Sequence, residues 1–177
     1  MKVLFVCLGN ICRSPMAEAM FRQMIAQNHL ADQVQVDSAA TSYEEEGNGP
    51  HPGALKIMHK YHLPTEGLIS RPITQADFAT ADLIIGMDDM NIRHLKAIAP
   101  KEDRFKIHQA FDVVPGKAGT SIPDPWYTHR FQDTYDSLAE ALPYWMDVVK
   151  RQLHDQHKFS DVNSMIRKKR SGVDNHV

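Results

Sequence analysis

Apolar and polar residues alternate in blocks along this chain, so that short apolar runs are separated by segments with helical spacing. An apolar run without polar alternation is typical of a strand in a parallel sheet that is covered on both faces. Apolar positions three and four residues apart instead predict amphipathic helices. Strands are predicted at residues 2–6, 34–38, 82–87 and, more weakly, 106–109. Helices are predicted at residues 13–28, 53–61, 74–80, 90–98 and 131–153.

Strands that alternate with helices favour an open α/β fold with a parallel sheet. In such sheets, ligands bind beyond the carboxyl ends of the strands. Cys7, Ser38 and Asp88 each lie at or just after the end of a predicted strand. We therefore expect these three side chains at one edge of the sheet, where a site would form.

The length of 177 residues suits one domain. We assign residues 1–154 to this domain and expect the polar segment 155–177 to be a mobile tail. The tail contains the basic run Arg167-Lys168-Lys169-Arg170. Such a run is usually only a solvated tail, and the alternative is docking to an acidic partner or lipid.

Net charge and cysteine content narrow the class of protein. A formal charge of −2 gives no sign of a nucleic-acid footprint. The first apolar run is too short for a signal peptide or a membrane span and no longer run follows, so we expect a cytoplasmic protein without stable membrane insertion. Two cysteines are too few for a four-ligand zinc site, and the histidines lack a convincing set of metal partners. A catalytic or redox role for Cys7 and Cys12 is left open.

The segment Cys7-Leu8-Gly9-Asn10-Ile11-Cys12-Arg13-Ser14 places a thiol after a buried strand and an arginine in the first turn of a helix. The N–H groups of such a loop bind an oxyanion and favour a thiolate over a thiol, which makes Cys7 a candidate nucleophile. Arg13 offers a planar fork for two phosphoryl oxygens, and Ser14 is placed to hydrogen-bond the sulfur of Cys7. Gly9 and Asn10 tolerate the left-handed backbone that a loop around an anion needs.

This loop and its flanks closely resemble the low-molecular-weight tyrosine phosphatases. The resemblance covers about residues 1–153 and is carried by residues 3–18, 37–42, 71–74, 77–80, 87–88 and 124–127. It implies a four-stranded parallel sheet flanked by helices, with a phosphate-binding loop between strand one and helix one. It also implies that the protein uses no metal or organic cofactor.

The resemblance further implies roles for individual residues. Asp124 would protonate the leaving phenol and later accept a proton from water, although Asp-Pro alone is a common turn. Trp126 and Tyr127 would grip the phenyl ring, with Leu8 as an apolar floor and Tyr43 as a possible third wall. Ser38 would hydrogen-bond Asn10, and Asp88 would support the loop at most, because the histidine that some members place near Leu68 is absent. Cys12 would capture oxidised Cys7 as a disulfide. Phosphate would be bound by the loop residues Leu8, Gly9, Asn10, Ile11, Cys12 and Ser14.

The expected function is hydrolysis of phosphotyrosine in proteins, and of small aryl phosphates, through a phosphocysteine intermediate. One alternative is a protein-arginine phosphatase of the same family, which resembles this chain except for a threonine where Ile11 stands. A second is a non-catalytic phosphotyrosine-binding module, which predicts loss of Arg13, the serine or the acid. Arsenate reductase on this scaffold needs further cysteines downstream, and none follows Cys12.

Overall fold

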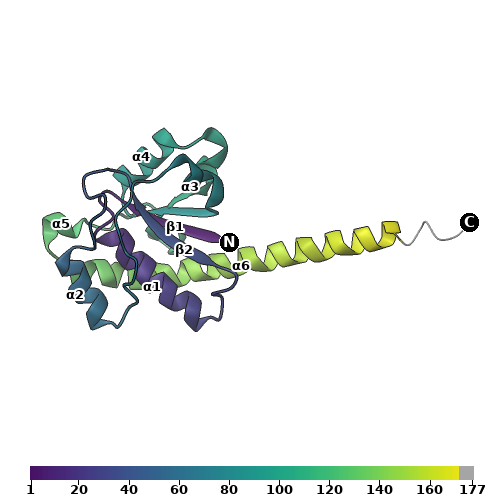
Figure 1. The fold of residues 1–177 in the computed structure, drawn as a ribbon, viewed down its shortest axis with the longest axis horizontal. Helices are drawn as coiled ribbons and strands as arrows, with labels where there is room; N and C mark the ends of the chain where they lie inside the picture. Colours follow the sequence, from purple (N-terminus) through teal and green to yellow (C-terminus); the bar gives the residue numbers. More distant parts are fainter. Residues whose placement is uncertain (172–177) are drawn as a thin grey trace, which may run out of the picture. The chain divides into compact units, whose positions relative to one another are not determined.

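The computed structural model describes residues 1–171 of the chain and contains one four-stranded parallel sheet. The strands are β1 (Lys2–Cys7), β2 (Gln35–Ala40), β3 (Leu83–Gly86) and β4 (Ile107–Gln109). Their order in the sheet is β2-β1-β3-β4, so β1 and β3 are the inner strands. Figure 1 labels β1 beside its neighbour β2. The open α/β fold that the alternating pattern predicts is confirmed, as is the number of strands that the family resemblance implies.

Helices cover the two faces of this sheet because successive residues of a strand point to opposite sides. On one side, Leu4 and Val6 belong to a buried cluster with Phe78 of α3 (Gln75–Thr80) and Leu95 of α4 (Asp89–Ile98). On the other side, the ring of Phe5 meets the ring of Phe21 from α1 (Arg13–Gln27) edge-on, with 5.5 Å between centroids.

The register of the strands brings three loops together at one edge. Cys7, the last residue of β1, pairs with Ala40, the last residue of β2, and Val6 pairs with Gly86, the last residue of β3. The loops that follow these strands therefore leave the sheet side by side. Two further segments complete this edge: α2 (Pro52–Lys60) and the short helix α5 (Pro125–Thr128).

The last helix departs from the sequence-based expectation. α6 runs from Phe131 to Ser171, so its predicted end at Leu153 is wrong. The segment after Leu153 is polar, but no glycine or proline interrupts it before Gly172, and polarity alone does not prevent a helix. Two short 3-10 helices were also not predicted, η1 (Lys101–Lys106) and η2 (Ala110–Val113).

The chain divides into two compact units, Met1–Tyr144 and the part that begins at Trp145. The sheet and the loops at its carboxyl edge all belong to the first unit. The predicted boundary at residue 154 and the predicted mobility of 155–177 stay predictions, and residues 172–177 lie outside the described part. Within residues 1–171, no helix combines the length and the apolar character that crossing a bilayer requires.

Candidate active site

The loop between β1 and α1 holds its peptide groups in one orientation. Five of its carbonyl oxygens accept hydrogen bonds from residues around the loop or from the first turn of α1. Because all described peptide bonds are trans, the N–H that follows each of these carbonyls points the opposite way, toward the inside of the loop. The donors are Thr41 N to Cys7 O (3.0 Å), Ser42 N to Leu8 O (3.1 Å), Ser70 Oγ to Gly9 O (2.8 Å), His51 N to Ile11 O (2.8 Å) and Met16 N to Cys12 O (3.3 Å).

Asn10 fixes the turn at the middle of this loop. Its φ of 55° is the left-handed value that the sequence led us to expect, and its side chain is buried. Asn10 Nδ2 donates to Ser14 Oγ (2.7 Å) and to Ser38 Oγ (2.9 Å), so the contact with Ser38 implied by the resemblance is present. Asn10 Oδ1 accepts from the backbone N–H of Arg71 (3.2 Å). One amide side chain therefore joins the loop, α1, β2 and the segment before α3.

The two cysteines of the loop are both free thiols, and they differ in surroundings. Cys7 Sγ lies 3.1 Å from Ser14 Oγ, the contact that the sequence led us to expect. Burial raises the pKa of Cys12 to about 12, and the negative charges of Cys7 and Asp124 contribute in the same direction. Cys12 is therefore a neutral thiol near pH 7. Of the two cysteines, Cys7 is the one that lies beside the hydroxyl of Ser14.

Arg13 is almost completely buried, with 1% of its surface exposed. Its Nη1 donates to Asp88 Oδ2 (2.6 Å) and to the carbonyl of Ile122 (2.9 Å), and its Nη2 lies 3.4 Å from Asp124 Oδ2. Burial lowers the pKa of Arg13, but the negative charge of Cys7 and the hydrogen bond to Asp88 outweigh it, so the pKa lies above its usual value. Within the described part of the chain, Nε has no hydrogen-bond partner. Asp88 thus holds the arginine directly.

A buried carboxylate behind the loop was missed by the sequence reasoning. Glu18 of α1 accepts a hydrogen bond from Ser38 Oγ (2.8 Å) and pairs with Arg22 one turn later in the helix. Burial raises the pKa of Glu18, while the hydrogen bond from Ser38 and the charge of Arg22 lower it, with a net rise. A continuous hydrogen-bonded chain thus runs from Arg22 through Glu18 and Ser38 to Asn10. In the sequence, the only sign of this role is the position of Glu18 on the buried face of α1.

Asp124 stands at the start of α5, opposite the loop. Its backbone is extended, as the following proline predicts, and its Oδ1 accepts from the backbone N–H of Trp126 (3.1 Å). The ring of Trp126 meets the ring of His51 edge-on at 5.7 Å between centroids, and His51 also stacks on Phe131 at 4.9 Å. Because the N–H of His51 binds the loop carbonyl of Ile11, this histidine connects the loop to the segment that carries Asp124. Nothing in the sequence marked His51 for this position.

One pocket contains Cys7, Arg13 and Asp124, which the sequence predicts as nucleophile, phosphate-binding arginine and acid. Trp126 and Tyr127 form part of its wall and are 50% and 74% exposed. Tyr43 is not among the described residues that line it, whereas Glu44 and Glu45, for which the sequence predicted no role, are. In the described part of the chain, no group of three or more His, Cys, Asp or Glu is arranged to hold a metal ion. The lining residues are Cys7, Leu8, Gly9, Ile11, Cys12, Arg13, Glu44, Glu45, Asp124, Trp126 and Tyr127.

Comparison with known proteins decides the family. The model of the low molecular weight phosphotyrosine protein phosphatase family matches residues 2–156. The chain belongs to this family.

Individual relatives agree with the assignment to the low-molecular-weight phosphatases. The chain is 38% identical over 150 residues to the low molecular weight protein-tyrosine-phosphatase YfkJ of Bacillus subtilis, covering 85% of this chain and 96% of the relative. It is 36% identical to PtpA of Staphylococcus aureus, covering 83% and 92%. The crystal structure of YfkJ superposes with a TM-score of 0.83 at 34% identity, covering 86% of this chain and 96% of that one. A structure of the arginine phosphatase YwlE superposes with a TM-score of 0.75 at 28% identity, covering 85% and 96%.

Proposed function

We propose that this phosphatase hydrolyses phosphotyrosine in proteins, and small aryl phosphates, through a phosphocysteine intermediate. The observation that carries the proposal is one pocket in which Cys7, the inward N–H groups of the loop, Arg13 and Asp124 face each other beside two aromatic rings. The inward N–H groups bind the oxygens of the phosphate.

In the first step, the sulfur of Cys7 attacks phosphorus and the bond from phosphorus to the phenolic oxygen breaks. Nη1 of Arg13 is anchored, so Nε, which has no partner within the described part of the chain, and Nη2, which exchanges its contact with Asp124 for the phosphate, bind two phosphoryl oxygens. A phenolate leaves poorly because phenol has a pKa of about 10, so Asp124 donates a proton to the departing oxygen.

In the second step, water attacks phosphorus and Asp124, now a carboxylate, accepts its proton. The bond from phosphorus to sulfur breaks and inorganic phosphate forms. Ser14, whose hydroxyl lies 3.1 Å from Cys7 Sγ, stabilises the sulfur as it leaves. Ser38 and Asp88 support this machinery from outside the pocket, through Asn10 and Arg13 respectively.

Phosphoarginine is the rival substrate, because the chain is also similar in fold to the arginine phosphatase YwlE. The apolar side chain of Ile11 and the rings of Trp126 and Tyr127 line the pocket and favour a phenyl ring instead. A module that only binds phosphotyrosine would not need the acid or the serine, and both are in place.

The test is hydrolysis of phosphotyrosine, phosphoserine and phosphoarginine by the purified protein without added metal. We expect a strong preference for phosphotyrosine, and activity that falls to background in Cys7→Ser because a hydroxyl is a much weaker nucleophile here than a thiolate. Preference for phosphoarginine would keep the mechanism and change the substrate. Inactivity of the wild type would leave binding alone as the function.

Asp124→Ala tests the general acid. The variant should slow phosphorylation of Cys7 by phenyl phosphates by about 10²–10⁴-fold, because a positioned proton donor contributes about that much. Aryl phosphates with strongly acidic leaving groups need no proton, so the loss should be much smaller for them. Rapid-mixing measurement of the phenol burst across a series of leaving groups checks this, and equal slowing throughout the series would exclude Asp124 as the acid.

Cys12 protects the nucleophile from oxidation in this proposal. A peroxide converts Cys7 to a sulfenic acid, and the thiol of Cys12 then displaces water to form a disulfide that thiols reverse. Mass spectrometry of peroxide-treated protein should find the Cys7–Cys12 link and full recovery with a thiol. Irreversibly oxidised Cys7 next to an unmodified Cys12 would contradict this role.

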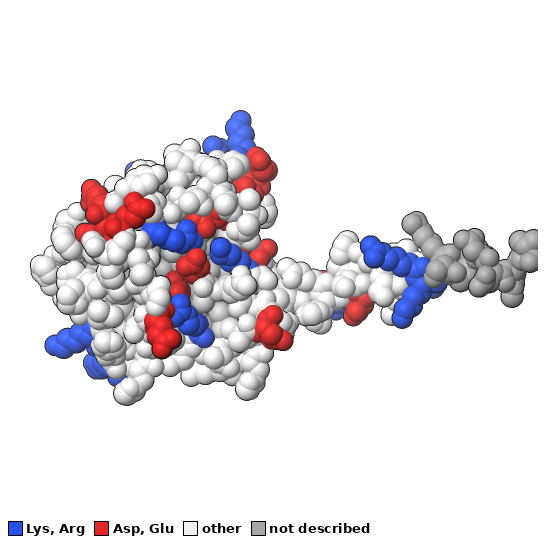
Figure 2. Space-filling view, in the orientation of Figure 1, with Lys and Arg blue, Asp and Glu red and all other residues white. Residues whose placement is uncertain are grey.

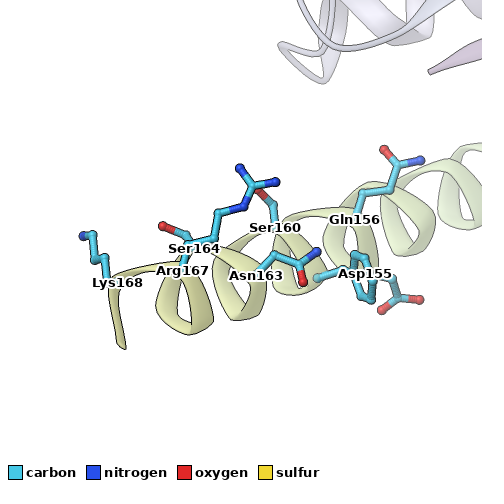
Figure 3. Close-up of a pocket in the computed structure, with 8 residues that line it drawn as sticks. Asp155, Gln156, Ser160, Asn163, Ser164, Arg167 and Lys168 are labelled. Atoms are coloured by element: carbon cyan, nitrogen blue, oxygen red, sulfur yellow. The ribbon is translucent and has the colours of Figure 1, made fainter. Parts of the chain in front are cut away.

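We propose that the protein is located in the cytoplasm, where reducing conditions keep thiols such as those of Cys7 and Cys12 free. We also propose that residues 1–154 form the catalytic domain and that the segment after them contacts an acidic partner. Figure 3 shows the side chains of α6, between Asp155 and Lys168, that line a shallow hollow; among the described residues only this helix contributes to it, so we do not treat it as a ligand cavity. Lys and Arg side chains gather on the last described turns of α6 (Figure 2).

The acidic partner that fits this segment is an anionic membrane surface. Phe159, Val162 and Ile166 recur at helical spacing and are 71%, 52% and 45% exposed, and a basic run follows them. Apolar side chains beside cations suit the boundary between acyl chains and anionic headgroups. The full-length protein should sediment with anionic but not with zwitterionic vesicles, and Arg167→Gln/Lys168→Gln/Lys169→Gln should abolish this. Equal sedimentation of variant and wild type would refute the contact.

A further inference from the structure

Two glutamates stand at the mouth of the pocket where a peptide substrate would pass. Glu44 is exposed and Glu45 is partly exposed, and both come from the loop between β2 and α2. Neither has a role in the proposed reaction. Their position in the wall means that residues next to the phosphotyrosine of a bound peptide would meet their carboxylates.

The loop that carries these glutamates is tied to the phosphate-binding loop. The hydroxyl of Ser70 donates to the carbonyl of Gly9. The loop between β2 and α2, called the acidic loop from here on, is bound by the backbone of the same serine: the N–H of Gly47 donates to the carbonyl of Ser70 (2.9 Å), and the N–H of Ser70 donates to the carbonyl of Asn48 (2.8 Å). The carboxylate of Glu45 accepts from Asn48 Nδ2 (2.8 Å). The side chain of Glu45 also lies close to Gly9, since a Cβ built on that glycine would be 3.5 Å from Glu45 Cγ. The carboxylate of Glu45 is therefore held in place beside the site, and Glu44 precedes it in the same loop.

The described residues that line the pocket include more acidic than basic side chains. Among the described residues that line it, Arg13 is the only Lys or Arg, and its charge is already opposed by Asp88 and Asp124. Glu45 acts electrostatically on the interior, because it is among the negative groups that raise the pKa of Cys12. The inward N–H groups still attract the phosphate, but the described lining residues offer no further cation to an acidic residue beside it.

We infer that Glu44 and Glu45 select phosphotyrosine peptides with Lys or Arg beside the phosphotyrosine and reject peptides with Asp or Glu there. This inference rests on the proposed phosphotyrosine hydrolysis and names its substrate class. A basic neighbour forms exposed ion pairs with the two carboxylates, whereas an acidic neighbour is repelled. Exposed pairs are weak and salt screens them, so the two glutamates together are expected to give about a tenfold preference at low ionic strength.

The experiment measures kcat/KM of the full-length protein on three phosphotyrosine peptides of equal length, with Lys, Gln or Glu on both sides of the phosphotyrosine. The wild type should prefer the Lys peptide over the Glu peptide about tenfold, with the Gln peptide between, and added salt should reduce the ratio. In Glu44→Gln/Glu45→Gln the ratio should fall close to one.

Glu46→Gln is the matched control, because Glu46 is exposed in the same loop but is not among the residues that line the pocket. This variant should keep the ratio of the wild type. Equal kcat/KM for the three peptides in the wild type, or an unchanged ratio in the double variant, would overturn the inference. A small aryl phosphate separates this from the proposed function: if the wild type hydrolyses it without discriminating among peptides, only the selection by charge fails. If the wild type does not hydrolyse it, the proposed function fails and the inference with it.

Discussion

The hydrogen bonds that hold the loop carbonyls outward are the constraint on which the rest of the active site depends. A peptide group has its donor and acceptor on opposite sides, so each carbonyl held from outside aims the next N–H at the centre of the loop. The donors come from segments that are far apart in the sequence, such as Thr41 after β2 and Ser70 before α3. The pairing of β1 with β2 brings Thr41 to this edge, and the bridge between Ala40 and Pro72 brings the segment of Ser70 there. These long-range pairings are what make a short loop into an anion-binding site.

A second requirement follows, since the arginine in this site is buried. A buried guanidinium is costly unless it is paired and hydrogen-bonded. Arg13 meets this requirement with Asp88 on one nitrogen and Asp124 near another. The arrangement does two things at once: it pairs a buried charge, and it fixes the orientation of the guanidinium plane. Asp88 therefore binds Arg13 directly. This contact is more specific than the general support of the loop that the sequence led us to expect of Asp88.

The parts of the site that could be predicted from the sequence are those that are contiguous in it. Cys7 to Ser14 combine a strand end, a turn and a helix start within one loop, and each of these has a local signal. Asp124 needed the family resemblance, because Asp-Pro occurs in many ordinary turns. Glu18 and His51 could not be predicted, because their contacts with Ser38 and Ile11 exist only after the elements have packed. For α6, polar composition was taken to mean the absence of structure, although helix-forming residues continue to Ser171.

The way in which the acidic loop is attached has a consequence for how such enzymes diversify. Ser70 binds it through the main-chain atoms of Gly47 and Asn48, and main-chain atoms are present whatever side chain a residue has. Glu44 and Glu46 take no part in that attachment, so other amino acids could replace them without moving Gly9 or the groups that face the phosphate. At position 44, the charge beside the pocket can thus change by mutation while the main-chain attachment of the loop stays as it is.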